Sequence, residues 1–442
     1  MKTKCLLLSS LTILILSCCG ASGSTSAENP AAGSSTAAIQ EDDSPDVFQA
    51  SGSQSIEAPS SGSSSSGEET QEHPNAMGSA SEPPADRAAS SPDAASGATA
   101  DTTIDSGTAA HASGEASGTL PYNGQASASG TGPAGTFTAL HGALAVDGAD
   151  LVDQNGDSVR LYGMSTHGIT WFPQYVSYDT FLTLRDDWNT NCVRLALYTA
   201  EYNGYSSGGN QEELTSLVKD GIDYATDLGM YVIVDWHVLS DQDPNVHKED
   251  AIGFFQEISS LYKDHTNILY EICNEPNGYA TWDSVKSYAG EVIPVIREND
   301  EDAVILVGTP SWCQNIDQAA SSLLEFDNVM YTLHFYAATH TDDLRRRLED
   351  AADDGLPIFV SEFGMCDASG NGGNNFEQAD KWMELLDKYN ISFICWNLAN
   401  KAETSSVLKS GCEKISDWTE DELSESGLWI REHFRKISAA EG

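Results

Sequence analysis

The sequence predicts an α/β fold: a (β/α)8 TIM barrel with a short N-terminal β-hairpin at the barrel bottom, preceded by a long disordered tether. Three observations support this prediction. From residue 137 onward, eight apolar, strand-like runs alternate with amphipathic helical stretches, a pattern typical of a parallel sheet covered by helices. Eight strand–helix units close a barrel of about 250 residues. Residues 20–136 lack the apolar side chains that a folded core requires.

Residues 1–19 are predicted to form an export signal. Lys2 and Lys4 make a short basic region, and the mostly apolar run Leu6–Leu16 is too short to span a bilayer, which takes about 20 residues. Cys18 follows the small residue Ser17, an arrangement that resembles a bacterial lipoprotein signal. We therefore expect a secreted protein, or one tethered to the cell surface by a lipid on Cys18. The alternative is an ordinary cleaved signal with incidental cysteines.

Residues 20–136 are predicted to be a disordered, acidic linker. They consist mainly of Ser, Ala, Gly, Thr and acidic residues; Arg87 is their only Lys or Arg, and Phe48 and Tyr122 are isolated aromatics. Such a segment buries too little apolar surface to offset the entropy that is lost on ordering. We therefore expect one folded domain, residues 137–442, of a size that suits a single barrel, and no separate binding module.

Two short strands are predicted at the start of this domain, at residues 144–146 and 150–152. Asn155 and Gly156 form a strong turn signal after them, because this pair tolerates the positive φ of a tight hairpin turn. We expect the hairpin to close the bottom of the barrel.

The eight barrel strands are predicted from short apolar runs. In chain order these are Arg160–Met164, Cys192–Tyr198, Tyr231–Trp236, Ile268–Cys273, Val304–Val307, Val329–Phe335, Ile358–Val360 and Phe393–Trp396. Amphipathic helices are predicted between them. The clearest are Glu212–Leu228, Glu249–Lys263, Trp282–Glu298 and Phe376–Tyr389.

Polar and aromatic side chains follow almost every predicted strand. A strand that is buried on both faces is normally apolar throughout, and the C-terminal ends of barrel strands meet at the face where active sites of this fold lie. Taken singly, a histidine or glutamate at a strand end is more often structural. The predicted face carries two Glu, three His, one Arg and several Trp and Tyr. Burying so many polar and charged groups together costs free energy, and such clusters are typical of functional sites. The set therefore predicts a functional site.

The net charge of −45 narrows the choice of partners. Nucleic acid is not expected, because its binding requires Lys and Arg to displace counterions. A neutral polymer or a small neutral ligand fits better, and the charge itself is most simply a solvated surface. We expect a monomer with no cofactor and no metal. Asp235 and His237 are a possible start of a metal site, but the other histidines are not at metal-ligand spacing.

Six of the nine cysteines lie in the predicted domain. An even number in an exported protein permits disulfides. Cys192, Cys273 and Cys395, however, lie inside apolar runs, where a free thiol packs as a small hydrophobe. Buried free thiols are therefore favoured, with disulfides as the alternative.

The strand-end residues match a known family. The chain resembles glycoside hydrolase family 5 (cellulase family A), and within it the bacterial endo-β-1,4-glucanases of the subfamily-2 type, over roughly residues 140–437. NEP alone is a weak motif, but NEP after the fourth strand with SEFG after the seventh, and with Arg, Asp-Trp-His and His-x-Tyr at other strand ends, is highly specific. The strings that carry the resemblance are RLYGMSTHGITWF, RLALY, YVIVDWHVLSDQDPN, ILYEICNEPNG, VMYTLHFYA, IFVSEFG and ICWNLANK.

The resemblance implies that Glu275 is the general acid/base and that Glu362 is the nucleophile. It implies further that five residues support this pair: Arg194, Asn274, His237, His334 and Tyr336. The residues expected to contact substrate, with Tyr198 from the end of the second strand among them, are His167, Trp171, Tyr198, Trp312, Trp396 and Lys401.

Two departures from the family pattern are visible. Phe363 stands where a Trp often follows the nucleophile, and Asn400 stands where the loop of the eighth strand often carries His. Neither touches the catalytic pair, but we expect both to bear on sugar binding.

The implied mechanism is a double displacement by two carboxyl groups about 5–5.5 Å apart, which retains the anomeric configuration. We expect Glu362 to be ionised, because Arg194 favours its charge and Tyr336 donates a hydrogen bond to it. Glu275 should start protonated, because a neighbouring carboxylate disfavours a second charge, and should later act as base toward water. Asn274 is expected to bond the sugar 2-hydroxyl.

The favoured function is therefore endo-acting hydrolysis of internal β-1,4-glucosidic bonds of cellulose or related β-glucans, with a β-glucan polysaccharide as partner. The same mechanism acting on mannan, xylan or xyloglucan is the nearest alternative. A second alternative is a surface protein that binds glycans without cleaving them. That alternative requires a lost catalytic group, and none is missing from the motifs.

Overall fold

The computed structural model describes residues 132–441. The predicted export signal with Cys18, and the predicted linker up to residue 131, lie outside this described part. Within it, no helix has both the length and the apolar character that crossing a bilayer demands.

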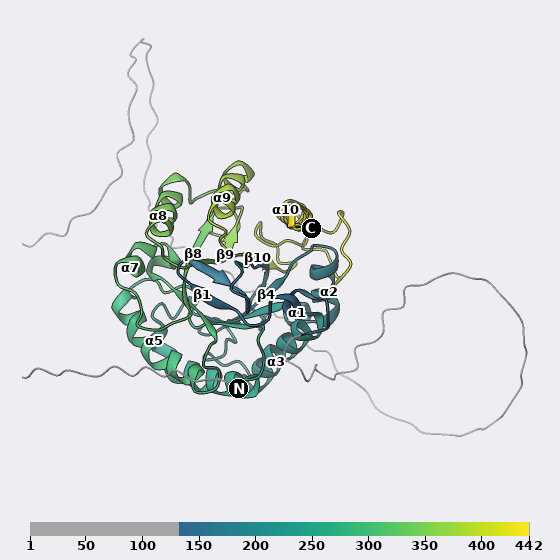
Figure 1. Ribbon diagram of the computed structural model, residues 1–442. Coiled ribbons are helices and arrows are strands. Elements are labelled where there is room, and N and C mark those ends of the chain that lie inside the picture. Colours follow the sequence, from purple (N-terminus) through teal and green to yellow (C-terminus); the bar gives the residue numbers. More distant parts are fainter. Residues whose placement is uncertain (1–131, 442) are drawn as a thin grey trace, which may run out of the picture. The chain divides into compact units, whose positions relative to one another are not determined.

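Eight parallel strands form a closed barrel, which confirms the predicted fold (Figure 1). Each strand pairs with the next one along the chain, and β10 pairs with β3 to close the ring. The strands are β3 (Tyr162–Thr166), β4 (Cys192–Tyr198), β5 (Tyr231–His237), β6 (Ile268–Glu271), β7 (Val304–Gly308), β8 (Val329–Tyr336), β9 (Ile358–Gly364) and β10 (Phe393–Leu398).

At least one helix follows each strand and packs outside the barrel (Figure 1). Asn210 caps one of them, α3, by accepting from the Glu213 N–H, and Gly229 ends the same helix in the left-handed conformation. The helices are α2 (Tyr178–Asp186), α3 (Gln211–Leu228), α4 (Lys248–Leu261), α5 (Trp282–Arg297), α6 (Pro310–Cys313), α7 (Ile316–Ser321), α8 (Asp342–Asp353), α9 (Phe376–Lys388) and α10 (Glu425–Glu441), with 3-10 turns η1 (Pro173–Tyr175) and η2 (Pro244–His247).

The strand bounds differ from the prediction where a strand carries polar residues. The apolar run predicts only Ile358–Val360 for β9, whereas the strand continues through Ser361 and Glu362 to Gly364. The prediction follows hydrophobicity, and these two residues are polar because they belong to the site at the top of the barrel. In contrast, β6 ends at Glu271, before the predicted end at Cys273.

A small antiparallel sheet of β1 (Ala145–Asp147) and β2 (Asp150–Val152) follows helix α1 (Phe137–His141) and lies across one end of the barrel, where Figure 1 labels β1. Leu144 and Leu151 pack there with residues from the first half of the barrel strands, so this end is the bottom. Gly148, with a φ of 64°, lies in the turn between β1 and β2. The predicted Asn155–Gly156 turn instead leads back to Ser158, which bridges Val152.

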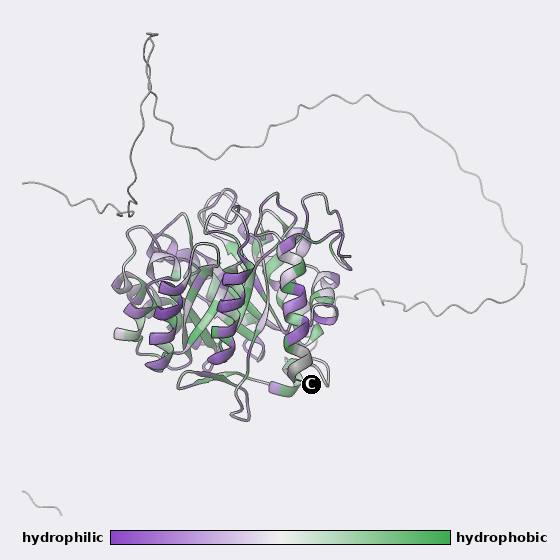
Figure 2. Cartoon of the chain, turned by 90° about the horizontal axis from the view of Figure 1, so that it is seen from above, coloured by the Kyte–Doolittle hydropathy of each residue, from purple (hydrophilic) through white to green (hydrophobic). Residues whose placement is uncertain are grey.

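Inside the barrel, inward-pointing side chains form two layers. The lower layer is apolar and includes Cys192, Ile233, Leu269, Phe359 and Ile394. Two residues further along the same strands, and therefore again on the inner face, stand Arg194, Asp235, Glu271, Ser361 and Trp396. The alternate residues face the helices and join the main core, and Figure 2 shows green strands inside helices whose outer faces are purple.

All six cysteines of the described part are free and buried. Cys192 and Cys395 lie in strands, and Cys273 lies two residues after the end of β6. Burial raises the pKa of the Cys366 thiol to about 12, so this thiol is a packing group and not a nucleophile at neutral pH.

Candidate active site

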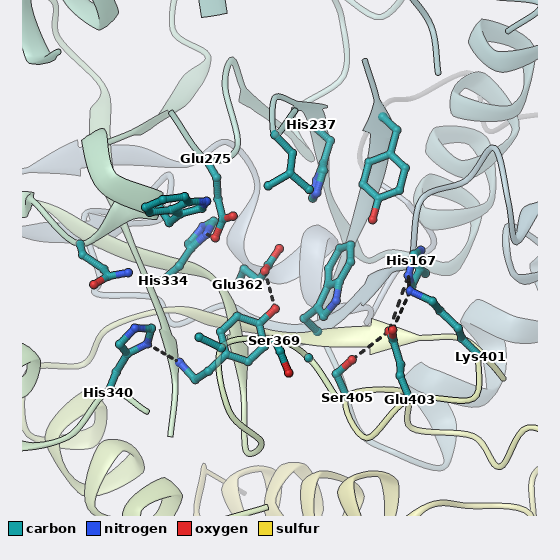
Figure 3. A pocket seen from close by; sticks show the side chains of 18 residues that line it. His167, His237, Glu275, His334, His340, Glu362, Ser369, Lys401, Glu403 and Ser405 are labelled. Carbon is teal, nitrogen blue, oxygen red and sulfur yellow. Dashed lines mark hydrogen bonds and ion pairs between the residues drawn. The ribbon is translucent and has the colours of Figure 1, made fainter. Parts of the chain in front are cut away.

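The C-terminal ends of the strands surround an open cavity of about 560 Å³ (Figure 3). Arg194 and Asn274 lie beneath it and are fully buried. Trp171 stands beside it, with its ring centroid 4.9 Å from that of Tyr198. The other predicted site residues line the cavity: His167, Tyr198, His237, Glu275, Trp312, His334, Tyr336, Glu362, Trp396 and Lys401.

Glu275 and Glu362 lie close together in this cavity (Figure 3). Glu275 is in the loop after β6, and Glu362 is in β9. One carboxyl oxygen of each lies within 4.8 Å of one oxygen of the other. This short separation agrees with the about 5–5.5 Å of a retaining pair of carboxyl groups, against about 6.5–9.5 Å when a water must fit between substrate and base.

Two donors hold Glu362. The Tyr336 hydroxyl donates to Oε1 at 2.7 Å, and Arg194 Nη1 donates to Oε2 at 3.4 Å. Both donors stabilise the charged carboxylate. Glu362 therefore presents an oriented, acceptor-only group, which is what a nucleophile needs.

The acidities of the two carboxyl groups depend mainly on burial. Burial, followed by the charge of Glu275, raises the pKa of Glu362 to about 7, although Arg194 and Tyr336 lower it as expected. Burial also raises the pKa of Glu275 to about 7, with Arg194 opposing and Glu271 adding to the rise. The pair therefore titrates as a unit near neutral pH, and the surrounding hydrogen bonds decide which member holds the proton.

Arg194 connects several groups below the cavity. Its Nε donates to Glu271 at 2.7 Å, its Nη2 donates to Asn274 Oδ1 at 2.6 Å, and Nη2 lies 3.0 Å from Asp235. Burial opposes its charge, but Asp235 and Glu271 outweigh burial and raise its pKa. The guanidinium is therefore fixed in place by two buried carboxylates while it holds Glu362.

His237 and Asn274 form one arm of this network. Asp235 Oδ2 lies 2.6 Å from His237 Nδ1, and Asn274 Nδ2 lies 3.2 Å from His237 Nε2. Because Arg194 can only donate, the Asn274 atom that faces it is the oxygen, and the amide nitrogen faces His237. His237 thus accepts at Nε2 and carries its hydrogen on Nδ1. The expected contact of Asn274 with a sugar hydroxyl stays a prediction.

Glu275 lies at the end of a second chain of hydrogen bonds, which runs through His334 and Ser361 to Glu271. Its Oε1 lies 3.0 Å from His334 Nδ1, and His334 Nε2 lies 2.9 Å from Ser361 Oγ. The Ser361 hydroxyl donates to Glu271 Oε1 at 2.7 Å. Since Glu271 also bonds Arg194, one buried carboxylate connects the supports of both catalytic glutamates.

The sequence prediction omits Glu271, Ser361, Glu403 and His340 from the site. Glu271 interrupts the apolar run of β6, and a charge in a strand buried on both faces is itself a signal. Ser361 is polar within β9 for the same reason. Glu403 and His340 line the cavity from loops, where no periodic pattern points to them.

Two tryptophans present indole faces at the cavity. Trp396, at the end of β10, stacks on His237 with ring centroids 5.2 Å apart. Trp312 is 47% exposed and, like Ser311 and Cys313, has a positive φ, so α6 is not a regular right-handed helix. Left-handed backbone at three non-glycine residues is strained, and here it holds an exposed indole at the rim.

Lys401 lies on the cavity wall between two polar side chains, those of Glu403 and His167. Its Nζ lies 2.6 Å from Glu403 Oε2 and 3.3 Å from His167 Nε2. Burial, then the charge of Lys401, lowers the pKa of His167 well below its usual value. This wall offers an ammonium group, a carboxylate and a neutral imidazole, which are suitable partners for sugar hydroxyls.

The two family departures lie away from the cavity. Phe363 is fully buried and stacks on Phe335 under the helices, with ring centroids 5.1 Å apart. Asn400 donates to the Cys412 carbonyl at 2.7 Å. Neither side chain lines the cavity, so the expectation that both bear on sugar binding stays a prediction and would have to act through neighbouring residues.

Glu275, His334 and Glu362 place donor atoms within 4.8 Å of one another, close enough to hold a cation. These atoms already have partners: Glu275 pairs with His334, and Glu362 with Tyr336 and Arg194. The guanidinium beside Glu362 also repels a second positive charge. Proton transfer and nucleophilic attack explain the group better than metal binding.

Comparisons with known proteins agree with this geometry. The profile of the family described as Cellulase (glycosyl hydrolase family 5) matches residues 152–402. Endoglucanase A of Butyrivibrio fibrisolvens is 51% identical over 300 residues, which cover 67% of this chain and 70% of that protein. The endoglucanase of Clostridium saccharobutylicum is 45% identical over 66% of this chain, but the match spans only 65% of that relative's length.

Solved structures give the same picture. The catalytic domain of the Thermobifida fusca endoglucanase Cel5A, in complex with cellotetraose, is 38% identical, with a TM-score of 0.65 over 68% of this chain and 100% of that one. The cellulase Cel5C_n is 43% identical, with a TM-score of 0.67 over 69% of this chain and 95% of that one. The folded part of the chain therefore has the architecture of these enzymes.

Proposed function

The chain belongs to glycosyl hydrolase family 5, and we propose that it is an endo-acting β-1,4-glucanase that hydrolyses cellulose or related β-glucans with retention of configuration. The observation that carries the proposal is the pair Glu275 and Glu362, with oxygens within 4.8 Å of each other and different hydrogen-bond partners. The substrate class is supported by relatives at 45–51% identity that are called endoglucanases.

In the first step, Glu362 attacks the anomeric carbon and forms a glycosyl–enzyme ester while the bond to the leaving oxygen breaks. Glu275 gives its proton to that oxygen, so the departing chain leaves as a neutral alcohol. Tyr336 and Arg194 hold the attacking carboxylate in one orientation before reaction. This preorganisation lowers the entropy loss in the transition state.

In the second step, Glu275 is a carboxylate and removes a proton from a water molecule. That water attacks the anomeric carbon from the face that the leaving group vacated, and Glu362 is released. The ester removes the negative charge of Glu362, so the repulsion that opposed a charged Glu275 is gone. One carboxyl group therefore serves as acid and then as base.

A panel of polysaccharides tests the substrate. We expect new reducing ends from carboxymethylcellulose and mixed-linkage β-glucan, with an early fall in viscosity that marks internal cleavage. Cleavage of mannan, xylan or xyloglucan without action on carboxymethylcellulose would overturn the glucan assignment. Glu275→Ala and Glu362→Ala should each abolish hydrolysis and keep glucan binding; substantial activity in either variant would overturn the assigned roles.

We further propose that the protein acts outside the cell as a monomer, either secreted or tethered by a lipid on Cys18. A polymeric substrate cannot cross a membrane, and the segment from Lys2 to Leu16 has the composition of an export signal. Metabolic labelling with a radioactive fatty acid distinguishes the two forms. Label that is lost in Cys18→Ala supports the tether, and unlabelled protein in the medium supports secretion.

A further inference from the structure

Glu271 lies below the cavity. In the described part of the chain, its side chain forms no direct hydrogen bond with Glu275 or Glu362. It is fully buried at the end of β6. Its two oxygens have separate tasks: Oε2 accepts from Arg194 Nε at 2.7 Å, and Oε1 accepts from the Ser361 hydroxyl at 2.7 Å. The mechanism above does not use this residue.

The Ser361 hydroxyl has one hydrogen, and that hydrogen points to Glu271. Its oxygen can therefore only accept from its other neighbour, His334 Nε2, at 2.9 Å. Burial lowers the pKa of His334 to about 4, although Glu362 and Glu271 oppose the shift, so the ring is neutral at working pH. A neutral ring carries one hydrogen, and this hydrogen must be on Nε2.

This tautomer determines how His334 can bond to Glu275. Glu275 Oε1 lies 3.0 Å from the other ring nitrogen of His334, Nδ1. A bare Nδ1 is an acceptor, so only a protonated Glu275 can make a hydrogen bond with it. We infer that Glu271 is a positioning residue that fixes His334, through Ser361, as the tautomer whose Nδ1 accepts the proton of the acid. This inference rests on the proposed function in assigning Glu275 as that acid.

The same tautomer serves the second step. Once Glu275 has given up its proton, its carboxylate faces a bare nitrogen, and two acceptors repel each other. The repulsion makes the carboxylate a stronger base toward water. No proton moves along the chain of hydrogen bonds; the network only sets the orientation of one hydrogen.

Other charged groups also act on Glu275, so a test must separate them from Glu271. The ionisable groups that interact with Glu275 or line the same cavity come from five strands and one helix: Arg194, Asp235, His237, Glu271, Cys313, His334, Tyr336 and Glu362. A substitution at Asp235 removes a negative charge near Arg194 but leaves the hydrogen bonds of Ser361 in place. A substitution at Glu271 removes a similar charge and also reverses the hydrogen bond from Ser361. The two can be distinguished because Asp235 bonds His237 and has no bond to Ser361.

Glu271→Gln reverses the direction of the network. Arg194 Nε requires an acceptor, so the amide oxygen faces it and the amide NH2 faces Ser361. The Ser361 hydrogen then turns to His334 Nε2, and the ring hydrogen moves to Nδ1, where it stabilises an ionised Glu275. The alkaline limb of the pH profile of kcat/KM should shift by about one unit to lower pH.

The direct test is the 15N NMR spectrum of His334 in the full chain, labelled at histidine and assigned with a His334→Asn variant. We expect hydrogen on Nε2 in the wild type and on Nδ1 in Glu271→Gln. The matched control, Asp235→Asn, removes an equivalent buried carboxylate beside Arg194 and should leave the His334 tautomer unchanged. Ser361→Ala provides a second variant should Glu271→Gln not fold; it should weaken the preference for the Nε2 hydrogen.

An unchanged His334 tautomer in Glu271→Gln, or hydrogen on Nδ1 in the wild type, overturns the inference. Because this measurement needs no substrate, it is independent of the polysaccharide panel. A wild-type protein that is inactive on glucans but has the expected tautomers would contradict the proposed function and leave the hydrogen-bond assignment intact.

Discussion

The lower and the upper layer inside the barrel stand on the same strands, two residues apart, and differ in almost every other respect. Ile233, Leu269 and Phe359 of the lower layer are apolar and fully or almost fully buried. Above them, Asp235, Glu271 and Ser361 are equally buried but polar, and they bond one another or Arg194 and the histidines. Burial alone thus does not distinguish core from site; the chemistry of the buried groups does.

The difference teaches how the barrel divides stability and function. Apolar burial in the lower layer stabilises the fold at about 25 cal/mol per Å². The upper layer carries charges whose desolvation cost roughly cancels their attraction. It contributes little net stability when complete, but it orients Glu275 and Glu362.

The largest expected effect comes from breaking the upper layer at its centre. Arg194→Met leaves Asp235 and Glu271 buried without their cation, so unfolding free energy should fall by about 3–5 kcal/mol. Activity should fall together with stability. Denaturant unfolding and kcat/KM of the purified variant check both. A stable, active variant would contradict the view that Arg194 holds this layer together.

The corresponding change in the lower layer should separate stability from function. Phe359→Ala removes a fully buried ring at the barrel bottom, and the cavity left behind should cost about 3 kcal/mol. Phe359 belongs to the apolar cluster at the barrel bottom, which contains no catalytic residue, so kcat of the fraction that remains folded should stay near the wild-type value. A large loss of kcat at a temperature where circular dichroism shows the variant folded would contradict the separation.

The charge in the upper layer also predicts how stability depends on pH. The pKa of Glu275, the member of the pair that holds the proton, is raised in the folded protein from 4.5 to about 7, mainly by burial. Its contribution to stability is therefore present below the unfolded pKa and is lost as pH rises through about 7. Glu275→Gln removes this loss, so the variant should gain about 2 kcal/mol on the wild type between pH 5 and pH 8.

Chemical unfolding of both proteins at these two pH values provides the measurement. The same difference for Phe359→Leu, a change in the lower layer, should be independent of pH. A Glu275→Gln variant whose advantage shrinks as pH rises would contradict the raised pKa of Glu275.

The smallest effect is expected at the rim. Trp312→Ala removes an exposed indole that lines the cavity, at a cost in sugar stacking of about 1 kcal/mol. KM for a soluble oligosaccharide should rise about fivefold with little change in kcat. Tyr202→Ala is the control, since Tyr202 is 79% exposed but does not line the cavity; equal effects of the two changes would exclude a specific stacking role for Trp312.

The two layers also explain what the sequence could predict. Apolar runs such as Cys192–Tyr198 are local, so the number and order of the strands follow from pattern alone, whereas the exact ends of β6 and β9 do not. The polar character of Glu271 and Ser361 is visible in the sequence, but their role is not, because it depends on contacts across the barrel: Arg194 and Glu271 are 77 positions apart, and Ser361 and Glu271 are 90 apart. Such pairs become visible only when register and strand bulges place them.

The acidities could not be predicted either. The sequence names Arg194 and Tyr336 as groups that favour a charged Glu362, and both act in that direction. The degree of burial, which outweighs them, depends on how completely the loops close the barrel top. A local pattern contains no measure of that closure.

The central claim is that Glu275 and Glu362 cleave by double displacement, and the stereochemistry of the first product tests it most directly. Proton NMR during the first minutes of hydrolysis of a soluble β-1,4-glucan oligosaccharide should show the β-anomer at the new reducing end. The α-anomer should appear only later, as mutarotation proceeds. An α-anomer that appears first would mean inversion and would contradict the assignment of Glu362 as nucleophile.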